Sequence, residues 1–194
     1  SALSVAEGRP RAPGSDVKRT GSTILHVGPH PAGIGGSHYE FIAGGAGAPV
    51  PEWDRDLAPR VLRFIEARIA DGSVLAIHDI SDGGLAVAAA EMAFGGDGAG
   101  MDLDLATITD PGCAQENVLF SEGPHRFLVE IEPAQVAAFV AAGSGIPIAE
   151  IGKTTAGDTL HIASGRASLI EASVSSLKEI WRTPLTAVWP EEAI

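Results

Sequence analysis

Residues 76–94, AIHDISDGGLAVAAAEMAF, contain the strand, turn and helix that decide the fold. The apolar run at 73–77, SVLAI, follows an Asp-Gly turn and predicts a short strand that is covered on both faces. A helix is expected at 84–94, where Glu91 is the only charged residue. Because this helix is apolar almost all round, it should lie in the middle of the molecule. The glycine-rich segment at 95–98 then ends it.

The segments on either side predict a mixture of strands and helices. Residues 99–105, AGMDLDL, alternate apolar and acidic side chains and predict a half-exposed strand. Residues 57–70 predict a helix with one apolar side, capped by Asp56. The other predicted elements are strands at 22–28, 126–131, 146–151, 159–162 and 168–172, helices at 112–119, at 133–142 and from Ser175 or Ser176 through Trp181, and an irregular loop at 29–37. This order predicts the α+β class, with a mixed or antiparallel sheet and helices packed on one face.

The length of 194 residues is enough for one core of ordinary size. Residues 1–21 are rich in Gly, Pro, Arg and Ser and show no apolar period, so they are expected to be a linker or the remnant of an upstream domain. Residues 22–194 are expected to form a single lobe. Because the chain opens with Ser1, it is expected to be a processed product or a piece of a longer protein.

The composition excludes several classes of function. With 13 basic and 25 acidic residues the formal net charge is −12, and the basic residues form no patch with interleaved aromatic side chains, so nucleic acid is not an expected partner. A single cysteine, Cys113, excludes an internal disulfide and fits a cytoplasmic protein. No apolar run reaches the roughly 20 residues of a membrane span, so no membrane is expected either.

The bend at residues 79–84 is the first candidate site. Gly83 and Gly84 allow close approach of a ligand, and the start of the following helix suits an anion. Asp79 and Asp82 would repel a bare phosphate, so a divalent cation is needed to bridge them to it. The alternative is structural, with Ser81 or Asp82 as a helix cap and a packed histidine before them.

The second candidate site is the turn at residues 120–127, FSEGPHRF. It places the hydroxyl of Ser121, the carboxylate of Glu122, an imidazole and the guanidinium of Arg126 before an apolar strand. The structural alternative is a buried ion pair between Glu122 and Arg126 that fixes the turn.

Three other patterns in the sequence do not predict a functional site. The loop at 33–39 lacks the last glycine of a dinucleotide fingerprint and is expected to be shaped for close backbone contact. His26, His30 and His38 have no cysteine partners and no shared helix, so no metal site is predicted. Cys113 has no candidate base and is expected to be a small packed residue.

Taken together, these motifs resemble those of the small-type phosphoribosylformylglycinamidine synthase family, PurL. Residues 78–88, HDISDGGLAVA, with 91–93, EMA, are similar to a family stretch almost residue for residue. Residues 119–122, LFSE, with 126–127, RF, are similar to a second, and 35–39, GGSHY, to a third, in which the family has glutamate where this chain has His38. The order of these segments and the spacing between them agree with the family over about residues 16–183.

The resemblance implies the fourth subdomain of such an enzyme, a C-terminal lobe of the aminoimidazole ribonucleotide synthetase superfamily with the PurM-like C-terminal fold. The family converts formylglycinamide ribonucleotide to the amidine with ATP, magnesium and ammonia from glutamine. Its catalytic residues lie in earlier subdomains, so no catalytic residue is assigned and the isolated chain is expected to be inactive. The motif positions carried over as cofactor-binding are Asp79, Ser81, Asp82, Gly83, Gly84, Ser121 and Glu122.

The implied partners are the remaining PurL subdomains, a PurQ-type glutaminase and a PurS-type subunit. Two alternatives remain open. One is a lobe of another superfamily member, such as thiamine-monophosphate kinase or selenophosphate synthetase. The other is a module that binds a nucleotide or a protein without catalysis.

Overall fold

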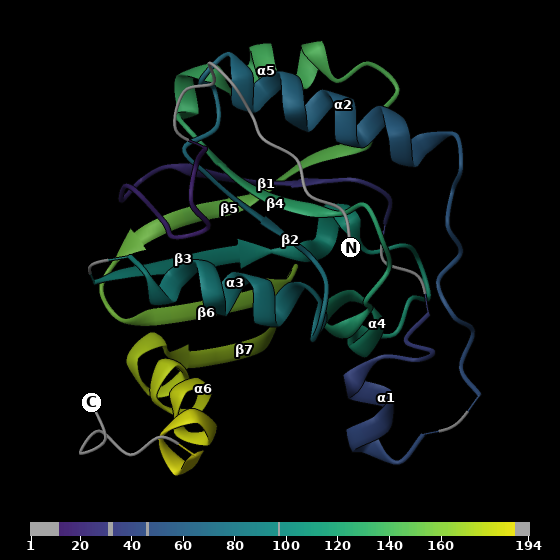
Figure 1. Cartoon of the computed structure of the whole chain (residues 1–194), viewed down its shortest axis with the longest axis vertical. Helices are drawn as coiled ribbons and strands as arrows, with labels where there is room; N and C mark the ends of the chain where they lie inside the picture. The colour runs from purple at the N-terminus through teal and green to yellow at the C-terminus, as the bar shows by residue number, and fades with distance from the viewer. Residues whose placement is uncertain (1–11, 31–32, 46, 97, 189–194) are drawn as a thin grey trace.

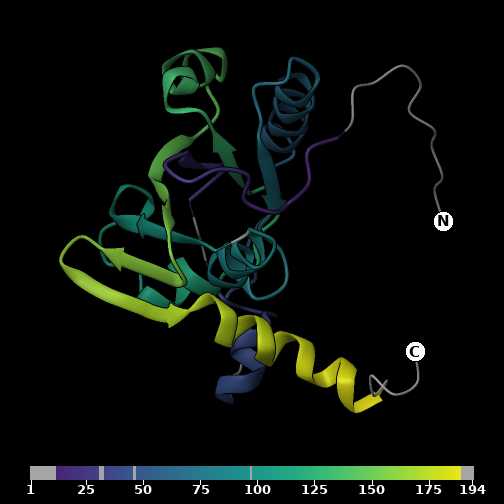
Figure 2. The same cartoon turned by 90° about the vertical axis from the view of Figure 1, so that its left-hand side faces the viewer.

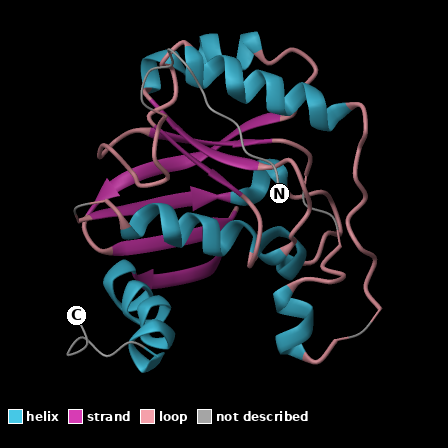
Figure 3. Cartoon of the chain, viewed as in Figure 1, coloured by secondary structure: helices cyan, strands magenta, loops and turns pink. Residues whose placement is uncertain are grey.

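The computed structural model describes residues 12–30, 33–45, 47–96 and 98–188, which form one seven-stranded sheet with helices around it (Figures 1 and 3). The strand order is β2-β4-β1-β5-β3-β6-β7, and all neighbours are antiparallel except the parallel pair β3 and β6. The strands are β1 (Thr23–Val27), β2 (Ala76–Asp79), β3 (Ala99–Asp104), β4 (Phe127–Ile131), β5 (Ile148–Ala156), β6 (Thr159–Ser164) and β7 (Ala167–Ser173). The predicted α+β class with a mixed sheet is confirmed.

Six α-helices and two short 3-10 helices complete the described part of the chain. They are α1 (His38–Ala43), α2 (Leu57–Ala70), α3 (Gly84–Phe94), α4 (Gln115–Phe120), α5 (Val136–Ala142) and α6 (Val174–Val188), with 3-10 turns at Leu105–Ile108 and Pro133–Gln135. None of these helices has the length and apolar character needed to cross a bilayer.

Helices lie on both faces of the sheet, whereas the sequence predicts one helical face. Successive residues of a strand point to opposite faces, and Ile24 and Leu25 of β1 belong to two different buried clusters. Ile24 packs in the cluster that contains α3, and Leu25 in the cluster that contains residues of α2 and α5. In both views α2 and α5 lie at the top, above α3 and α6 (Figures 1 and 2). A second helical layer is needed because β1 and β4 are interior strands of the sheet, and their apolar side chains point to both of its faces.

Helix α3 is the centre of the larger cluster, as its composition predicts. It spans Gly84–Phe94, the predicted bounds, and eight of its residues are buried. Strand β3 also agrees with its pattern, because Met101 and Leu103 are buried while Asp102 and Asp104 are exposed. Cys113 packs against this cluster as a partly buried side chain, and burial, followed by nearby Asp110, raises the pKa of its thiol.

Three local expectations need correction. Strand β2 starts at Ala76 rather than at residue 73, and it lies at the edge of the sheet beside β4. Its cover on both faces is as expected, because Ala76 belongs to the cluster of α3 and Ile77 packs against the cluster of α2. The N–H of Leu57 donates to Asp54 Oδ1 at 2.8 Å, so Asp54 rather than Asp56 caps α2. Helix α6 begins at Val174, one residue before Ser175 and two before Ser176, so both predicted cap residues lie inside the helix.

The N-terminus of α6 is capped by Ser173 and Asp158, and not by the predicted Ser175 or Ser176. The hydroxyl of Ser173 accepts from the N–H of Ser176 at 3.1 Å, and Asp158 Oδ1 accepts from the N–H of Ser175 at 2.8 Å. Asp158 lies in the turn between β5 and β6, and it reaches α6 because β7 pairs with β6 and brings the start of the helix back to this turn. Sequence spacing alone gives no sign of such a cap.

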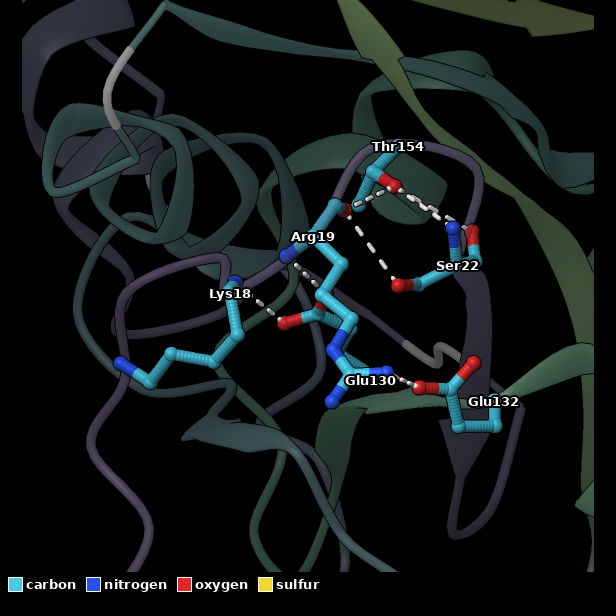
Figure 4. Close-up of polar contacts among 6 residues, drawn as sticks. All are labelled: Lys18, Arg19, Ser22, Glu130, Glu132 and Thr154. Carbon is cyan, nitrogen blue, oxygen red and sulfur yellow. Dashed lines mark hydrogen bonds and ion pairs between the residues drawn. The ribbon is translucent and has the colours of Figure 1, made fainter.

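Residues 12–21, the described part of the predicted linker, run against the body of the lobe. Val17 is buried, and its N–H donates to the carbonyl of Met92 at 2.9 Å. The carboxylate of Glu130, itself fully buried in β4, accepts from the N–H groups of Lys18 at 2.8 Å and Arg19 at 3.0 Å (Figure 4). Residues 1–11 of the predicted linker and 189–194 of the predicted lobe lie outside the described residues.

Candidate functional site

Glu122 joins the three segments that carry the family resemblance. Its Oε1 atom accepts from the N–H of Gly83 at 2.7 Å, across 39 positions of sequence. The same atom lies 2.9 Å from the backbone nitrogen and 3.0 Å from Nδ1 of His38, at the start of α1. The bend before α3, the turn after α4 and the loop before α1 therefore meet at one carboxylate.

The contact between Glu122 and His38 changes the pKa of both side chains. Burial by itself would raise the pKa of Glu122, but the hydrogen bonds from Gly83 and His38 outweigh it and lower that pKa. The hydrogen bond to Glu122, followed by the charges of Glu122 and Asp82, raises the pKa of His38. Glu122 therefore contributes stability above its ordinary pKa of 4.5 and loses it as the pH falls through the lowered value. His38 contributes below its ordinary 6.5 and loses this as the pH rises through the raised value.

Replacing Glu122 with glutamine should lower the pKa of His38 toward its ordinary value. The neutral amide no longer stabilises the imidazolium, so the largest cause of the upward shift is removed. An NMR titration of the His38 ring protons measures this. The matched control is Glu116→Gln on the exposed side of α4, which should leave the His38 titration where it is. An unchanged pKa in Glu122→Gln would contradict the described contact.

The remaining acidic positions of the bend point outward. Asp79 ends β2 with 66% of its side chain exposed, and Ser81 and Asp82 are also exposed. Asp79 and Ser81 line a cavity of about 800 Å³ beside α2. Asp82 instead lies with His38 and Glu122, and one ligand atom from each falls within 4.8 Å of the others. The three groups offer one nitrogen and two oxygen donors to a cation.

The two glycines of the bend serve a backbone turn, and the N–H groups considered for an anion are engaged. Gly83 and Gly84 both have positive φ angles, +77° and +70°. The N–H of Gly83 is bound by Glu122, and that of Gly84 donates to the carbonyl of Ser81 at 3.0 Å. The predicted side-chain cap from Ser81 or Asp82 is wrong, because α3 begins at Gly84 and its N-cap residue is Gly83, with no side-chain cap hydrogen bond among the described residues.

The predicted ion pair between Glu122 and Arg126 is wrong as well. Arg126 donates from Nε to the carbonyl of Gly123 at 3.1 Å and from Nη2 to the carbonyl of Ser121. These two hydrogen bonds of Arg126 close the turn at residues 121–126. The carboxylate of Glu122 instead contacts Gly83 and His38. Ser121 is fully buried, and its hydroxyl has no hydrogen-bond partner in the described part of the chain.

Three residues of this region are not among the predicted site positions. The sequence argues against His38 as a zinc ligand. It places the guanidinium of Arg126 in the second candidate turn without assigning it a functional role, and it gives no indication of Trp53, in the loop before α2. Trp53 is 65% exposed and lines the same cavity as Asp79. A signal is available for Arg126, because the sequence already places its guanidinium in the second candidate turn beside Glu122.

Comparison with known proteins gives the same family as the motifs. The family described as AIR synthase related protein, C-terminal domain, matches residues 19–163. Phosphoribosylformylglycinamidine synthase subunit PurL of Deinococcus radiodurans is 33% identical over 181 residues, which are 89% of this chain and 24% of that protein. PurL of Synechococcus elongatus is 39% identical over 154 residues, 76% of this chain and 19% of that protein. The resemblance to PurL is confirmed, and the chain spans about a quarter of the length of these relatives or less.

The fold is similar to that of a solved PurL. Thermotoga maritima PurL complexed with FGAR superimposes with a TM-score of 0.74 at 16% identity, covering 85% of this chain and 29% of that one. At this identity the likeness shows the fold alone. The same protein has been solved complexed with ATP and in the PurLQS assembly.

Proposed function

Because the chain belongs to the family of the AIR synthase related protein, C-terminal domain, we propose that it is the C-terminal lobe of a phosphoribosylformylglycinamidine synthase. The observation that carries the proposal is the position of Glu122, which ties together the three segments that resemble PurL. Relatives named as PurL, 33% and 39% identical, support the choice of this enzyme within the superfamily. The reaction is the ATP-dependent conversion of formylglycinamide ribonucleotide to formylglycinamidine ribonucleotide in purine biosynthesis.

In this proposal the lobe braces the enzyme and is not catalytic alone. A nucleotide phosphate does not fit the bend by itself, because the N–H groups of Gly83 and Gly84 are already bound and Asp79 and Asp82 add negative charge. Of the seven motif positions, Gly83, Gly84, Ser121 and Glu122 organise the bend. Asp79, Ser81 and Asp82 are exposed and are the positions that can reach a ligand or a neighbouring subdomain. ATP and magnesium belong to the full enzyme.

The proposed partners follow from the same relatives. The remaining PurL subdomains make up the larger part of the enzyme, of which the chain covers about a quarter. Glutaminase and PurS-type subunits are proposed because a structural neighbour has been solved in the PurLQS assembly. The proposed location is the cytoplasm, where a biosynthetic ligase meets its nucleotide substrates.

A chimera tests the proposal. Residues 12–188 replace the matching last quarter of Deinococcus radiodurans PurL, and amidine formation is followed with formylglycinamide ribonucleotide, ATP, magnesium and ammonia. We expect activity within about tenfold of the parent enzyme, a barrier difference of about 1.4 kcal/mol. The control is the parent enzyme truncated before this quarter, which should be inactive.

Two results would contradict the proposal. A chimera that melts cooperatively at the parent's temperature but makes no product would show that the lobe belongs to another enzyme. Turnover by the isolated 194-residue chain at the parent's rate would show that it is not a bracing lobe. Isothermal titration of the isolated chain with ATP and magnesium should show no tight binding.

A further inference from the structure

Arg126 is a buried cation without an acidic partner. Only 2% of the residue is exposed, and two of its nitrogens donate to backbone carbonyls, while Nη1 has no hydrogen-bond partner among the residues that the structure describes. Among the described residues no carboxylate lies within ion-pair distance of it, although the chain carries 25 acidic residues. Glu122, four positions away, is bound to Gly83 and His38 instead.

The neighbouring residue adds two further unpartnered ring nitrogens. His125 has both of them buried and unbonded, and its φ of +49° is the only positive value at a non-glycine residue of the described chain. Such a conformation costs free energy and is concentrated at ligand sites. It is held by close packing, since a Cβ on Gly28 would lie 2.4 Å from the carbonyl oxygen of His125.

Arg126 places one buried positive charge in this corner of an acidic protein. Burial, with no opposing acidic charge, lowers the pKa of Arg126 to about 10, so the guanidinium remains charged at neutral pH. Burial also lowers the pKa of His125, and the charge of Arg126 lowers it further against the opposing effect of Asp54. A buried charge with free hydrogen-bonding capacity is costly unless a counter-ion completes it.

Arg126 and His125 both line the cavity of about 800 Å³ beside α2, a size common for small-molecule sites. We infer that they form a subsite for the oxyanion of a small ligand, a phosphate group in the first place. The guanidinium supplies a charged donor and the neutral imidazole a second hydrogen bond. The rest of the ligand would lie along the apolar wall formed by Ile65, Ile69 and Phe127, toward Trp53.

The acidic side chains on the same cavity limit where the anion can lie. Asp79 and Glu122 are also on its wall. Glu122 already accepts from Gly83 and His38, and Asp79 stands at the end of β2 with most of its side chain in solvent. The anion is therefore assigned to the end formed by Arg126 and His125. This subsite does not depend on the proposed enzyme.

Phosphate binding tests the inference. The 194-residue chain is titrated with inorganic phosphate against chloride at equal ionic strength, and the side-chain NMR signals of Arg126 and His125 are followed. We expect saturable shifts at both residues. Arg126→Met should weaken binding by tenfold or more, because a charge-assisted hydrogen bond is lost. Arg63→Met, on the exposed side of α2, is the matched control and should bind phosphate as the parent does.

A second variant keeps the test decisive if Arg126→Met fails to fold. His125→Gly suits the positive φ and removes only the ring, so the fold should be retained and binding should weaken by about two- to tenfold. Binding of AMP that is tighter than that of phosphate would assign the anion to a nucleotide, and equal binding would assign it to free phosphate. No saturable shift with either, or equal shifts in the parent and both variants, would overturn the subsite.

Discussion

Gly84→Val should destabilise the lobe by about 2–5 kcal/mol, through left-handed backbone strain of about 1–2 kcal/mol and overpacking of about 1–3 kcal/mol. Gly84 has a φ of +70°, which a β-branched residue strongly disfavours. A Cβ there would lie 2.6 Å from both the carbonyl oxygen of Leu119 and the Cα of Phe120. Both neighbours are backbone atoms at the end of α4, so they cannot move aside without shifting that helix. Urea unfolding followed by circular dichroism measures the loss.

Gly112→Val is the matched control for this change. Gly112 has a φ of +83°, but a Cβ added there would have no neighbouring atom within 4 Å, so only the backbone strain of about 1–2 kcal/mol is expected. The difference between the two variants isolates the packing of the bend against α4. Equal losses would show that Gly84 is needed for its backbone angle alone.

Glu130→Gln is expected to cost about 1.5–3 kcal/mol, the range for hydrogen bonds to a charged group. The carboxylate is fully buried and accepts from the N–H groups of Lys18 and Arg19 (Figure 4). In the variant the NH₂ of the amide cannot accept a hydrogen bond, so one N–H is left without a partner. Residues 17–19 should then exchange their amide protons faster, because they lose their attachment to β4. Denaturant unfolding and hydrogen exchange measure the two effects.

Glu132→Gln separates this buried bond from the surface charge beside it. Glu132 pairs with the side chain of Arg19, and the two side chains are 34% and 63% exposed (Figure 4). An ion pair this accessible to water contributes less than about 1 kcal/mol. Unchanged exchange of residues 17–19 in Glu130→Gln, or an equal loss in Glu132→Gln, would show that the buried carboxylate does not hold this segment.

Local patterns are reliable where one physical signal dominates a segment. The bounds of α3 follow from a nearly uncharged run between two glycine pairs, and the faces of β3 follow from strict alternation. Both signals depend only on neighbouring residues. The prediction is weaker at β2, because an apolar run has no periodicity that marks its ends, and the strand starts at Ala76 instead of residue 73.

Pairings between side chains are not predictable in the same way. The partner expected for Glu122 is Arg126, four positions on and of opposite charge, but its partners are the N–H groups of Gly83 and His38 and the His38 ring. Backbone donors are present at almost every residue, so the sequence gives no sign of which one a carboxylate will meet. The same reason explains why Asp54 rather than Asp56 caps α2, and why Asp158 reaches the start of α6.

The sequence by itself determined the α+β class, the central helix after the glycine bend and the family, because these rest on composition, period and motif along the chain. The tertiary structure alone decided that helices cover both faces of the sheet, that Glu122 unites three distant segments, and that Arg126 is buried without an acidic partner among the described residues. These features depend on which surfaces meet when the helices and loops pack against the sheet. Burial then sets how strongly each charge and hydrogen bond contributes to stability.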